Sequence, residues 1–361
     1  MSLLYLRSNI SLSLCLIVLS LPLLSCNTLE RDTEYSLPRE EQDFPQMADV
    51  ITQIQNELKT EKHPHSVLRG FHAKSHGCLN GRLIVLPYNP ADTRFGIFVR
   101  EREYDILARF SNGLGFIQED SSPDVRGLAI KVLGVEGERV PPVPSDPYPE
   151  QHTQDFLMTN NPTQLTSTAQ EFMDFGKRQH DIGGLYLLKK WDSIKAAWRT
   201  RRHVTSLVNE QYWSDAPIRL GSRAIKFSAS PCIKDPSPGR DEDENYLTED
   251  LRTYADKNTI CFDFKVQFQL NPRKQPIEDA VVEWKEDDTP FVTVARIHFK
   301  PQKLKKTKGC EDLRFTPWHA LSDHQPIGNM NRGRRLVYES SQRHRYASFT
   351  EPNEHSLDTE P

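Results

Sequence analysis

The most constraining feature of the chain is a run near residue 265 in which apolar and polar side chains alternate. The apolar members of Cys261–Leu270 are Phe262, Phe264, Val266, Phe268 and Leu270, and the polar members between them are Asp263, Lys265, Gln267 and Gln269. Successive side chains of a strand point to opposite faces, so this pattern predicts a strand with one buried face and one solvated face.

Other segments also have the composition of strands. They are rich in Ile, Val, Phe and Leu and are separated by Gly, Pro and Asn; they span residues 82–86, 95–100, 105–111, 127–135, 222–228 and 291–299. Strands that follow one another about every ten residues are typical of an antiparallel sheet or barrel. The chain contains 25 Pro and 17 Gly, which also favours a β-rich architecture over a helical bundle.

Several helices are expected around these strands. Apolar residues recur at helical spacing in Gln46–Leu58, and residues 163–175 and 185–200 also have a helical pattern. Proline-rich residues 141–148 are expected to form a loop. A last helix over Asn331–Arg345 would place Arg334 and Tyr338 one turn apart on the same face.

The first 26 residues have the pattern of an export signal. Arg7 precedes an apolar run, Ile10–Leu24, that is shorter than a comfortable membrane span. The run ends in Leu-Leu-Ser-Cys, which resembles a bacterial lipobox and predicts lipidation at Cys26. An ordinary cleaved signal or a signal anchor is the alternative. We therefore expect a secreted or periplasmic protein, anchored to a membrane if the lipobox is used, with a polar tether at 27–45 and a disordered tail at 346–361.

Composition and cysteine spacing narrow the function. The 361-residue chain carries a formal net charge of -4, so no nucleic-acid partner is expected. Beyond the N-terminal region four cysteines remain, without a C-x-x-C motif: Cys78, Cys232, Cys261 and Cys310. One or two disulfides, in any of the three full pairings, and free buried thiols are all compatible with this pattern.

Four separated signatures occur in order along the chain. They are Arg69–Ala73 (R-G-F-H-A); Ala108–Gly113 (A-R-F-S-N-G) followed by Pro123–Lys131 (P-D-V-R-G-L-A-I-K); Asp155–Pro162 (D-F-L-M-T-N-N-P); and Arg334-x-x-x-Tyr338 with Arg343 and Arg345. Their order and spacing resemble the haem catalases and their smaller catalase-like relatives. The resemblance covers residues 46–345. Between residues 176 and 290 no motif matches, and only the strand-like composition is similar. It implies an α+β fold, a catalase-like antiparallel β-barrel with surrounding helices.

The resemblance implies that Tyr338 is the axial ligand of the iron of haem b, because catalases bind haem iron through a tyrosine. A phenol must bind iron as phenolate, and a neighbouring cation favours that form. Arg334, one helical turn away, is expected to supply this cation. Arg69, Arg109 and Arg345 resemble the residues that bind the two haem propionates, a task suited to the forked donors of guanidinium groups.

On the opposite side of the haem, His72 resembles the distal histidine. A neutral imidazole can take a proton from a bound peroxide and return it to the leaving oxygen. Ser111 resembles the serine that orients this imidazole. Asn160 resembles the asparagine that hydrogen-bonds the bound peroxide, with Asn161 as the alternative.

The function that this resemblance implies is haem-dependent breakdown of hydrogen peroxide or organic peroxides, of catalase or peroxidase type, through an oxoferryl intermediate. A peroxide substrate, an organic electron donor and a homo-oligomer are the partners compatible with it. Two departures stand out: Phe71 directly before His72, and polar Thr163 and Gln164 after the asparagine-proline pair. They leave two alternatives open, a haem enzyme that rearranges lipid hydroperoxides and a non-catalytic haem-binding protein.

Overall fold

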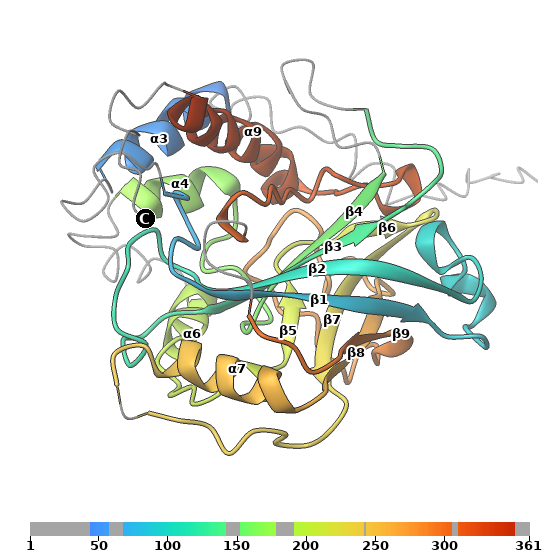
Figure 1. The fold of residues 1–361 in the computed structure, drawn as a ribbon. Coiled ribbons are helices and arrows are strands. Elements are labelled where there is room, and N and C mark those ends of the chain that lie inside the picture. The colour runs from blue at the N-terminus through green and yellow to red at the C-terminus, as the bar shows by residue number, and fades with distance from the viewer. Residues whose placement is uncertain are drawn as a thin grey trace, which may run out of the picture.

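The computed structural model describes residues 44–57, 68–141, 152–177, 191–241, 243–304 and 310–350. Its centre is an antiparallel β-barrel (Figure 1). The strands are β1 (Ser75–Val85), β2 (Arg102–Asn112), β3 (Arg126–Leu133), β4 (Thr153–Thr159), β5 (Tyr212–Ser214), β6 (Ile218–Leu220), β7 (Arg223–Pro231), β8 (Ile260–Phe268) and β9 (Val292–Phe299). They follow the order β5-β4-β3-β2-β1-β9-β8-β7-β6, and a further pairing of β5 with β7 closes the ring. The predicted α+β class and barrel are therefore confirmed.

Helices lie on two sides of the barrel. They are α3 (Phe44–Glu57), α4 (Ala169–Lys177), α6 (Trp191–Arg199), α7 (Tyr246–Lys257) and α9 (Asn329–Thr350). In Figure 1, α3, α4 and α9 gather above the strands, whereas α6 and α7 lie below them. No helix among the described residues has both the length and the apolar character that crossing a membrane requires.

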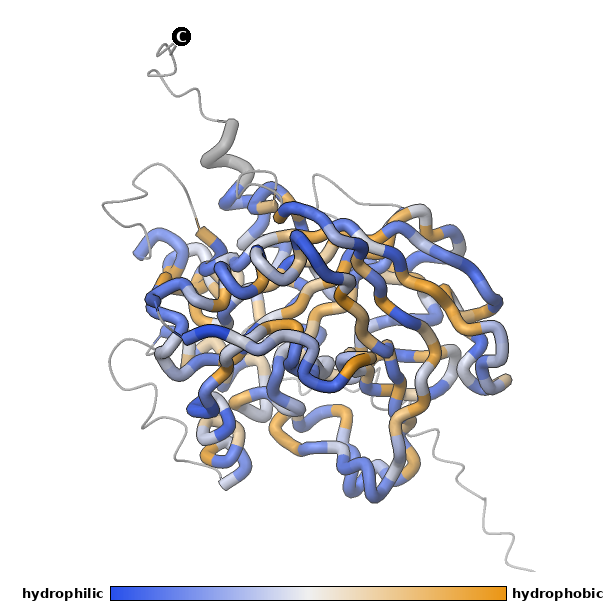
Figure 2. The backbone as a smooth tube through the Cα atoms, turned by 60° about the horizontal axis from the view of Figure 1, so that its bottom comes forward, coloured by the Kyte–Doolittle hydropathy of each residue, from blue (hydrophilic) through white to orange (hydrophobic). Residues whose placement is uncertain are grey.

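The barrel interior is filled by aromatic side chains. The ring of Phe156 lies 4.8 Å from that of Phe264 and 5.1 Å from that of Phe227, centroid to centroid. These residues alternate along their strands with residues that face outward, as a period of two requires. Figure 2 shows the apolar stretches of the backbone gathered inside the molecule and the hydrophilic ones mainly at its periphery. Burial of this core is the main force that holds the barrel together.

A second apolar cluster joins α3, α4 and α9 to one another. Its buried members are Phe44, Met47, Ile51, Ile54, Ala169, Met173, Ala216, Ala280 and Met330. Gly333 lets α9 approach α4 closely, because a Cβ at this position would lie 2.4 Å from the Cβ of Ala169. The three helices therefore form one layer, which packs over the outer face of the barrel.

Two disulfides link distant parts of the fold. Cys78 of β1 pairs with Cys310, and Cys232 pairs with Cys261 at the start of β8. This is one of the three full pairings that the sequence left open. The first disulfide attaches the segment that begins at residue 310 to the barrel wall, and this segment contributes to the site described below.

Several local predictions need correction. The predicted strand at 95–100 is wrong, since it contains the 3-10 helix Gly96–Phe98, and Gly96 has a positive φ of 54° that a strand does not allow. The predicted helix at 163–175 begins only at Ala169, because the hydroxyl of Thr168 accepts a hydrogen bond from the Glu171 backbone N–H (3.2 Å), as an N-cap does. Strands β4, β5 and β6 and helix α7 were not predicted.

The predicted ends of the domain also shift. Phe44 and Pro45, placed in the tether by the sequence, already belong to α3, and α9 continues through residues 346–350 of the predicted tail. The export signal, Cys26 and most of the tether lie outside the described residues and stay predictions.

Candidate functional site

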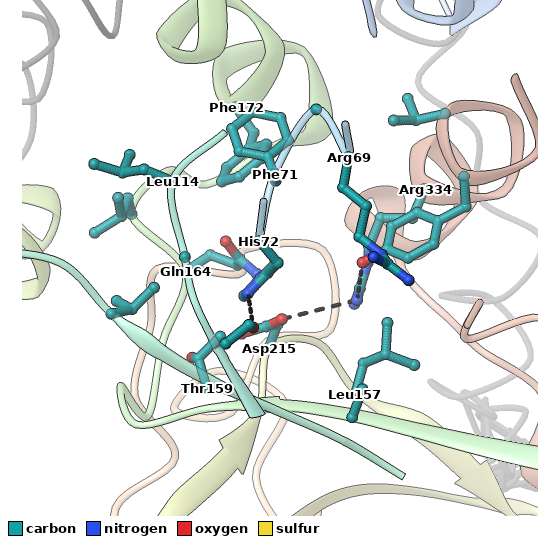
Figure 3. Close-up of a pocket in the computed structure, with 18 of the residues that line it drawn as sticks. Arg69, Phe71, His72, Leu114, Leu157, Thr159, Gln164, Phe172, Asp215 and Arg334 are labelled. Carbon is teal, nitrogen blue, oxygen red and sulfur yellow. Dashed lines mark hydrogen bonds and ion pairs between the residues drawn. The ribbon is translucent and has the colours of Figure 1, made fainter. Parts of the chain in front are cut away.

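A cavity of about 400 Å³ lies between the outer face of the barrel and the layer of α3, α4 and α9 (Figure 3). Its volume is within the range of about 300–1,000 Å³ usual for small-molecule sites. Its floor is made by outward-facing residues at one end of β2, β3 and β4. Two cross-strand rows form this floor, Ser111–Gly127–Thr159 and Arg109–Ala129–Leu157. The period of two that buries the phenylalanines inside the barrel thus turns these residues toward the cavity.

His72 enters the cavity from the segment that precedes β1. Its φ of 56° is unusual for a residue with a side chain, and two hydrogen bonds hold the backbone there. The His72 N–H donates to the carbonyl of Gly113 (2.8 Å), and the His72 carbonyl accepts from the Arg109 guanidinium (3.0 Å). The ring Nδ1 lies 3.1 Å from the Ser111 hydroxyl oxygen. The predicted pairing of His72 with Ser111 is therefore present in the structure.

The environment of His72 keeps its imidazole neutral. Burial, together with the positive charge of Arg109, lowers the pKa of His72 from 6.5 to about 4. Gly127 leaves room for the ring, because a Cβ on it would lie 2.6 Å from His72 Nδ1 and 2.7 Å from Ser111 Oγ. A neutral, oriented imidazole at a cavity wall can accept a proton and give it back.

Tyr338 and Arg334 line the other side of the cavity from α9. The Arg334 guanidinium donates to the Tyr338 hydroxyl oxygen over 3.1 Å, as their spacing of one turn predicts. Asp215, which the sequence did not single out, lies 3.8 Å from the same guanidinium. Burial raises the pKa of the Asp215 carboxyl while Arg334 opposes that shift. Arg334 is thus placed between two oxygens that can carry negative charge.

Three predicted arginines converge on one acidic residue at a further edge of the cavity. Arg69 forms an ion pair with the Glu311 carboxylate, Arg109 lies 3.1 Å from it, and Arg345 donates to the Glu311 carbonyl. Burial and the nearby Arg345 lower the pKa of Arg109 to about 9. Positive charge is therefore concentrated at this edge of the cavity, which favours binding of carboxylate groups. Glu311 was not predicted; it follows Cys310, whose disulfide holds this segment against β1.

The two asparagines behave differently from the prediction. The Asn160 Oδ1 accepts from the Arg126 N–H (2.7 Å) and its Nδ2 donates to Glu210 (2.7 Å). The Asn161 Nδ2 donates to the Ala196 carbonyl (3.0 Å). Neither asparagine is among the residues that line the cavity, whereas Thr159, just before them, is. The side chains chosen from sequence for the distal amide therefore make their contacts outside the cavity.

Aromatic and aliphatic side chains make the remaining wall beside His72. The ring of Phe71 packs 4.9 Å from that of Phe172 of α4, and both line the cavity. Figure 3 shows these rings next to His72, on the side away from Thr159. Further apolar lining residues are Leu114, Val125, Leu165, Met173 and Phe175. This side of the cavity is consequently suited to an apolar group.

The chain is similar to known proteins in part of its sequence and in its fold. No family model matches the chain. A catalase-related peroxidase of Mycolicibacterium paratuberculosis is 24% identical over 255 residues, which cover 65% of this chain and 76% of that protein. Among solved structures, a fungal catalase matches with a TM-score of 0.63 at 16% identity, and catalase A of Saccharomyces cerevisiae with 0.59 at 15%.

Both structural matches cover 78% of this chain but only 59% and 61% of the catalases, so the chain spans about three fifths of their length. Because the sequence identity to these structures is low, the matches are evidence for the fold alone. They agree with the closed antiparallel barrel and outer helices of this chain. The chain has the catalase fold, and part of its sequence is similar to that of a catalase-related peroxidase.

Proposed function

We propose that this chain is a haem-dependent oxidoreductase that breaks down hydrogen peroxide or organic peroxides. The observation that carries the proposal is the single cavity that brings the His72–Ser111 pair, the Arg334–Tyr338 pair and three arginines together. These groups come from segments that are far apart in the sequence. The similarity to a catalase-related peroxidase supports the same reaction class.

The donor groups around the cavity fit a haem. Tyr338 offers a phenolic oxygen, and Arg334 beside it would stabilise the phenolate. Arg69, Arg109 and Arg345 would bind the two propionates, sharing with them the contacts now made to Glu311. Between these ends the lining is largely apolar, as a porphyrin face requires. When bound, haem iron would supply the redox chemistry with peroxide.

The residues of the chain have defined tasks in this proposal. His72 takes the proton of the incoming peroxide on ring nitrogen Nε2, because Nδ1 faces the Ser111 hydroxyl. The same imidazole then holds the proton for return to the departing oxygen. Ser111 and the hydrogen bonds to Gly113 and Arg109 keep the ring in place. Apolar neighbours keep competing water away from this proton.

The pH dependence of turnover follows from the pKa of His72. Because that pKa is lowered to about 4, the imidazole is neutral and able to accept a proton throughout the range from about pH 5.5 to pH 8. We expect the initial rate of peroxide loss to be flat across this range and to fall as the pH approaches 4, where the ring becomes protonated. Stopped-flow rates in matched buffers test this, with circular dichroism at each pH to exclude unfolding. A midpoint near 6.5 would contradict the prediction.

A second function is favoured by the apolar wall. Phe71 and Phe172 line the cavity beside His72 and give it an apolar surface that suits a longer apolar chain. A haem enzyme that rearranges organic or lipid hydroperoxides would use such a wall. Both functions share the same haem site and differ in the substrate and in the fate of its oxygen atoms.

One experiment separates these functions. Haem-loaded protein is given hydrogen peroxide, with and without an organic electron donor, or a fatty-acid hydroperoxide, while substrate loss, released oxygen and oxidised donor are recorded. Oxygen release indicates a catalase, and donor-dependent loss indicates a peroxidase. Loss of the lipid hydroperoxide without either signal indicates a rearranging enzyme. Haem-loaded protein that consumes none of these substrates would contradict the proposed activity and leave a haem-binding role.

A further inference from the structure

The side chain of Asn160 is part of the framework of the fold. Its Oδ1 accepts a hydrogen bond from the backbone N–H of Arg126 (2.7 Å). Its own backbone N–H donates to the carbonyl of Arg126 (2.9 Å). Its Nδ2 donates to Glu210, which is 5% exposed and is itself paired with Arg202. Both polar atoms of this amide take part in contacts of the framework, and Asn160 is not among the residues that line the cavity.

Gln164 is placed differently. Its backbone N–H donates to the Ala280 carbonyl (3.0 Å), which fixes the position of the main chain. Its side chain lines the cavity, and Figure 3 shows the amide end directed toward His72. Within the described part of the chain, no residue forms a hydrogen bond with this amide. Gln164 therefore has two donor hydrogens and one acceptor oxygen available on the His72 side of the cavity.

The neighbouring residue supports the same interpretation. Thr163 also lines the cavity, is only 3% exposed, and has a hydroxyl oxygen without a hydrogen-bond partner among the described residues. A buried polar group without a partner is costly, so natural proteins rarely keep one unless a ligand or water satisfies it. Two consecutive polar side chains in a wall that is otherwise apolar indicate a polar ligand group at this point.

We propose that Gln164, and not Asn160, supplies the amide that hydrogen-bonds the peroxide opposite His72. This inference rests on the proposed function. The Gln164 side chain would donate a hydrogen bond from Nε2 to a peroxide oxygen, while His72 would accept the peroxide proton. The amide steers that oxygen toward the imidazole, so that the same proton can return to it. Thr163 provides a second polar contact at the edge of this position.

The test uses fluoride, a small anion that binds ferric haem and accepts hydrogen bonds from distal donors. The Kd of fluoride is measured by absorbance on haem-loaded wild type and on Gln164→Met, which keeps the length of the side chain and removes its amide. Loss of one net hydrogen bond is expected to raise this Kd about 3- to 10-fold. The melting temperature of the haem-free protein should stay unchanged, because the amide has no partner among the described residues.

Asn160→Ala is the matched comparison. It is expected to lower the melting temperature of the haem-free protein, because it removes the hydrogen bond from Asn160 to Glu210 and leaves the Arg126 N–H without its acceptor. At a temperature where it stays folded, its fluoride Kd should remain within about twofold of wild type, well below the effect of one lost hydrogen bond. If Asn160→Ala does not fold, Gln164→Leu is the second variant and should match Gln164→Met.

The outcomes are distinct. Unchanged fluoride affinity in Gln164→Met, with haem and fluoride bound normally by wild type, would overturn the role of Gln164 and leave the proposed function standing. Weaker fluoride binding in folded Asn160→Ala would return the distal role to Asn160. Failure of wild type to take up haem would overturn both proposals.

Discussion

Tyr338→Phe is expected to remove tight haem binding while leaving the chain folded. The substitution deletes the phenolic oxygen that Arg334 holds at 3.1 Å and keeps the ring that packs against the cavity. Loss of residues that merely support a metal ligand already costs about 10- to 100-fold in metal affinity. Loss of the ligand itself should therefore lower haem affinity by at least about 100-fold. Absorbance titration with ferric haem measures this directly.

The matched control for this variant is Tyr88→Phe. Tyr88 is 92% exposed and lies away from the cavity, so the same chemical change there should leave the titration of wild type unaltered. Circular dichroism confirms that both variants are folded. If Tyr338→Phe bound haem with the affinity and spectrum of wild type, the assignment of Tyr338 as the iron ligand would be wrong.

The second large effect is expected at His72. His72→Ala should retain bound haem, because the arginines and Tyr338 remain, and should lower the rate of peroxide breakdown by about 10²- to 10⁴-fold, the usual contribution of a positioned acid–base group. The structural reason is that the neutral imidazole, 3.1 Å from Ser111, is the only histidine that lines the cavity among the described residues. Rates are measured per bound haem, so that partial loading does not imitate the effect.

His76→Gln provides the control for this substitution. His76 is also buried and lies four residues after His72 in the sequence. Its ring forms hydrogen bonds with Thr248 (2.9 Å) and Asn112 (2.8 Å), and it does not line the cavity. Its replacement should reduce stability and leave the rate per bound haem within a few-fold of wild type. Equal losses of rate in the His72 and His76 variants would show that disturbance of the fold, rather than proton transfer, explains the effect.

Much of the barrel was predictable because its signal is local. The alternation over Cys261–Leu270 and the strands at 105–111 and 127–135 follow from side-chain periodicity alone, and β8, β2 and β3 confirm them. The short strands β5 and β6 were not predictable, since three residues carry no periodic signal and their pairing comes from closure of the ring. Disulfide pairing likewise depends on which strands are neighbours in space.

Contacts in the site were predictable where both interacting residues lie in recognisable sequence motifs. Arg334 and Tyr338 are one helical turn apart, so their contact follows from α9 alone. The meeting of His72 with Ser111 depends on the pairing of β1 with β2, yet each lies in a recognisable signature. Glu311 and Asp215 had no such signal, because a single acidic residue resembles many others in the sequence, and only the structure shows that arginines contact these two.

The orientation of the Asn160 side chain could not be predicted from its signature. Its amide contacts the Arg126 N–H and Glu210, and Glu210 lies in the stretch between 176 and 290 where the sequence offers no matching motif. The sequence shows Thr163 and Gln164 as polar departures after the asparagine-proline pair. Their place in the cavity wall comes from the structure alone, and the role proposed for Gln164 rests on it.

An absorbance titration of the purified protein with ferric haem b tests the tyrosine-ligated haem site directly. We expect saturation at one haem per chain and a high-spin ferric spectrum of the tyrosinate type, with both features lost in Tyr338→Phe. Binding without a defined stoichiometry, or a spectrum that does not change when Tyr338 is replaced, would contradict the claim that this cavity is a tyrosine-ligated haem site.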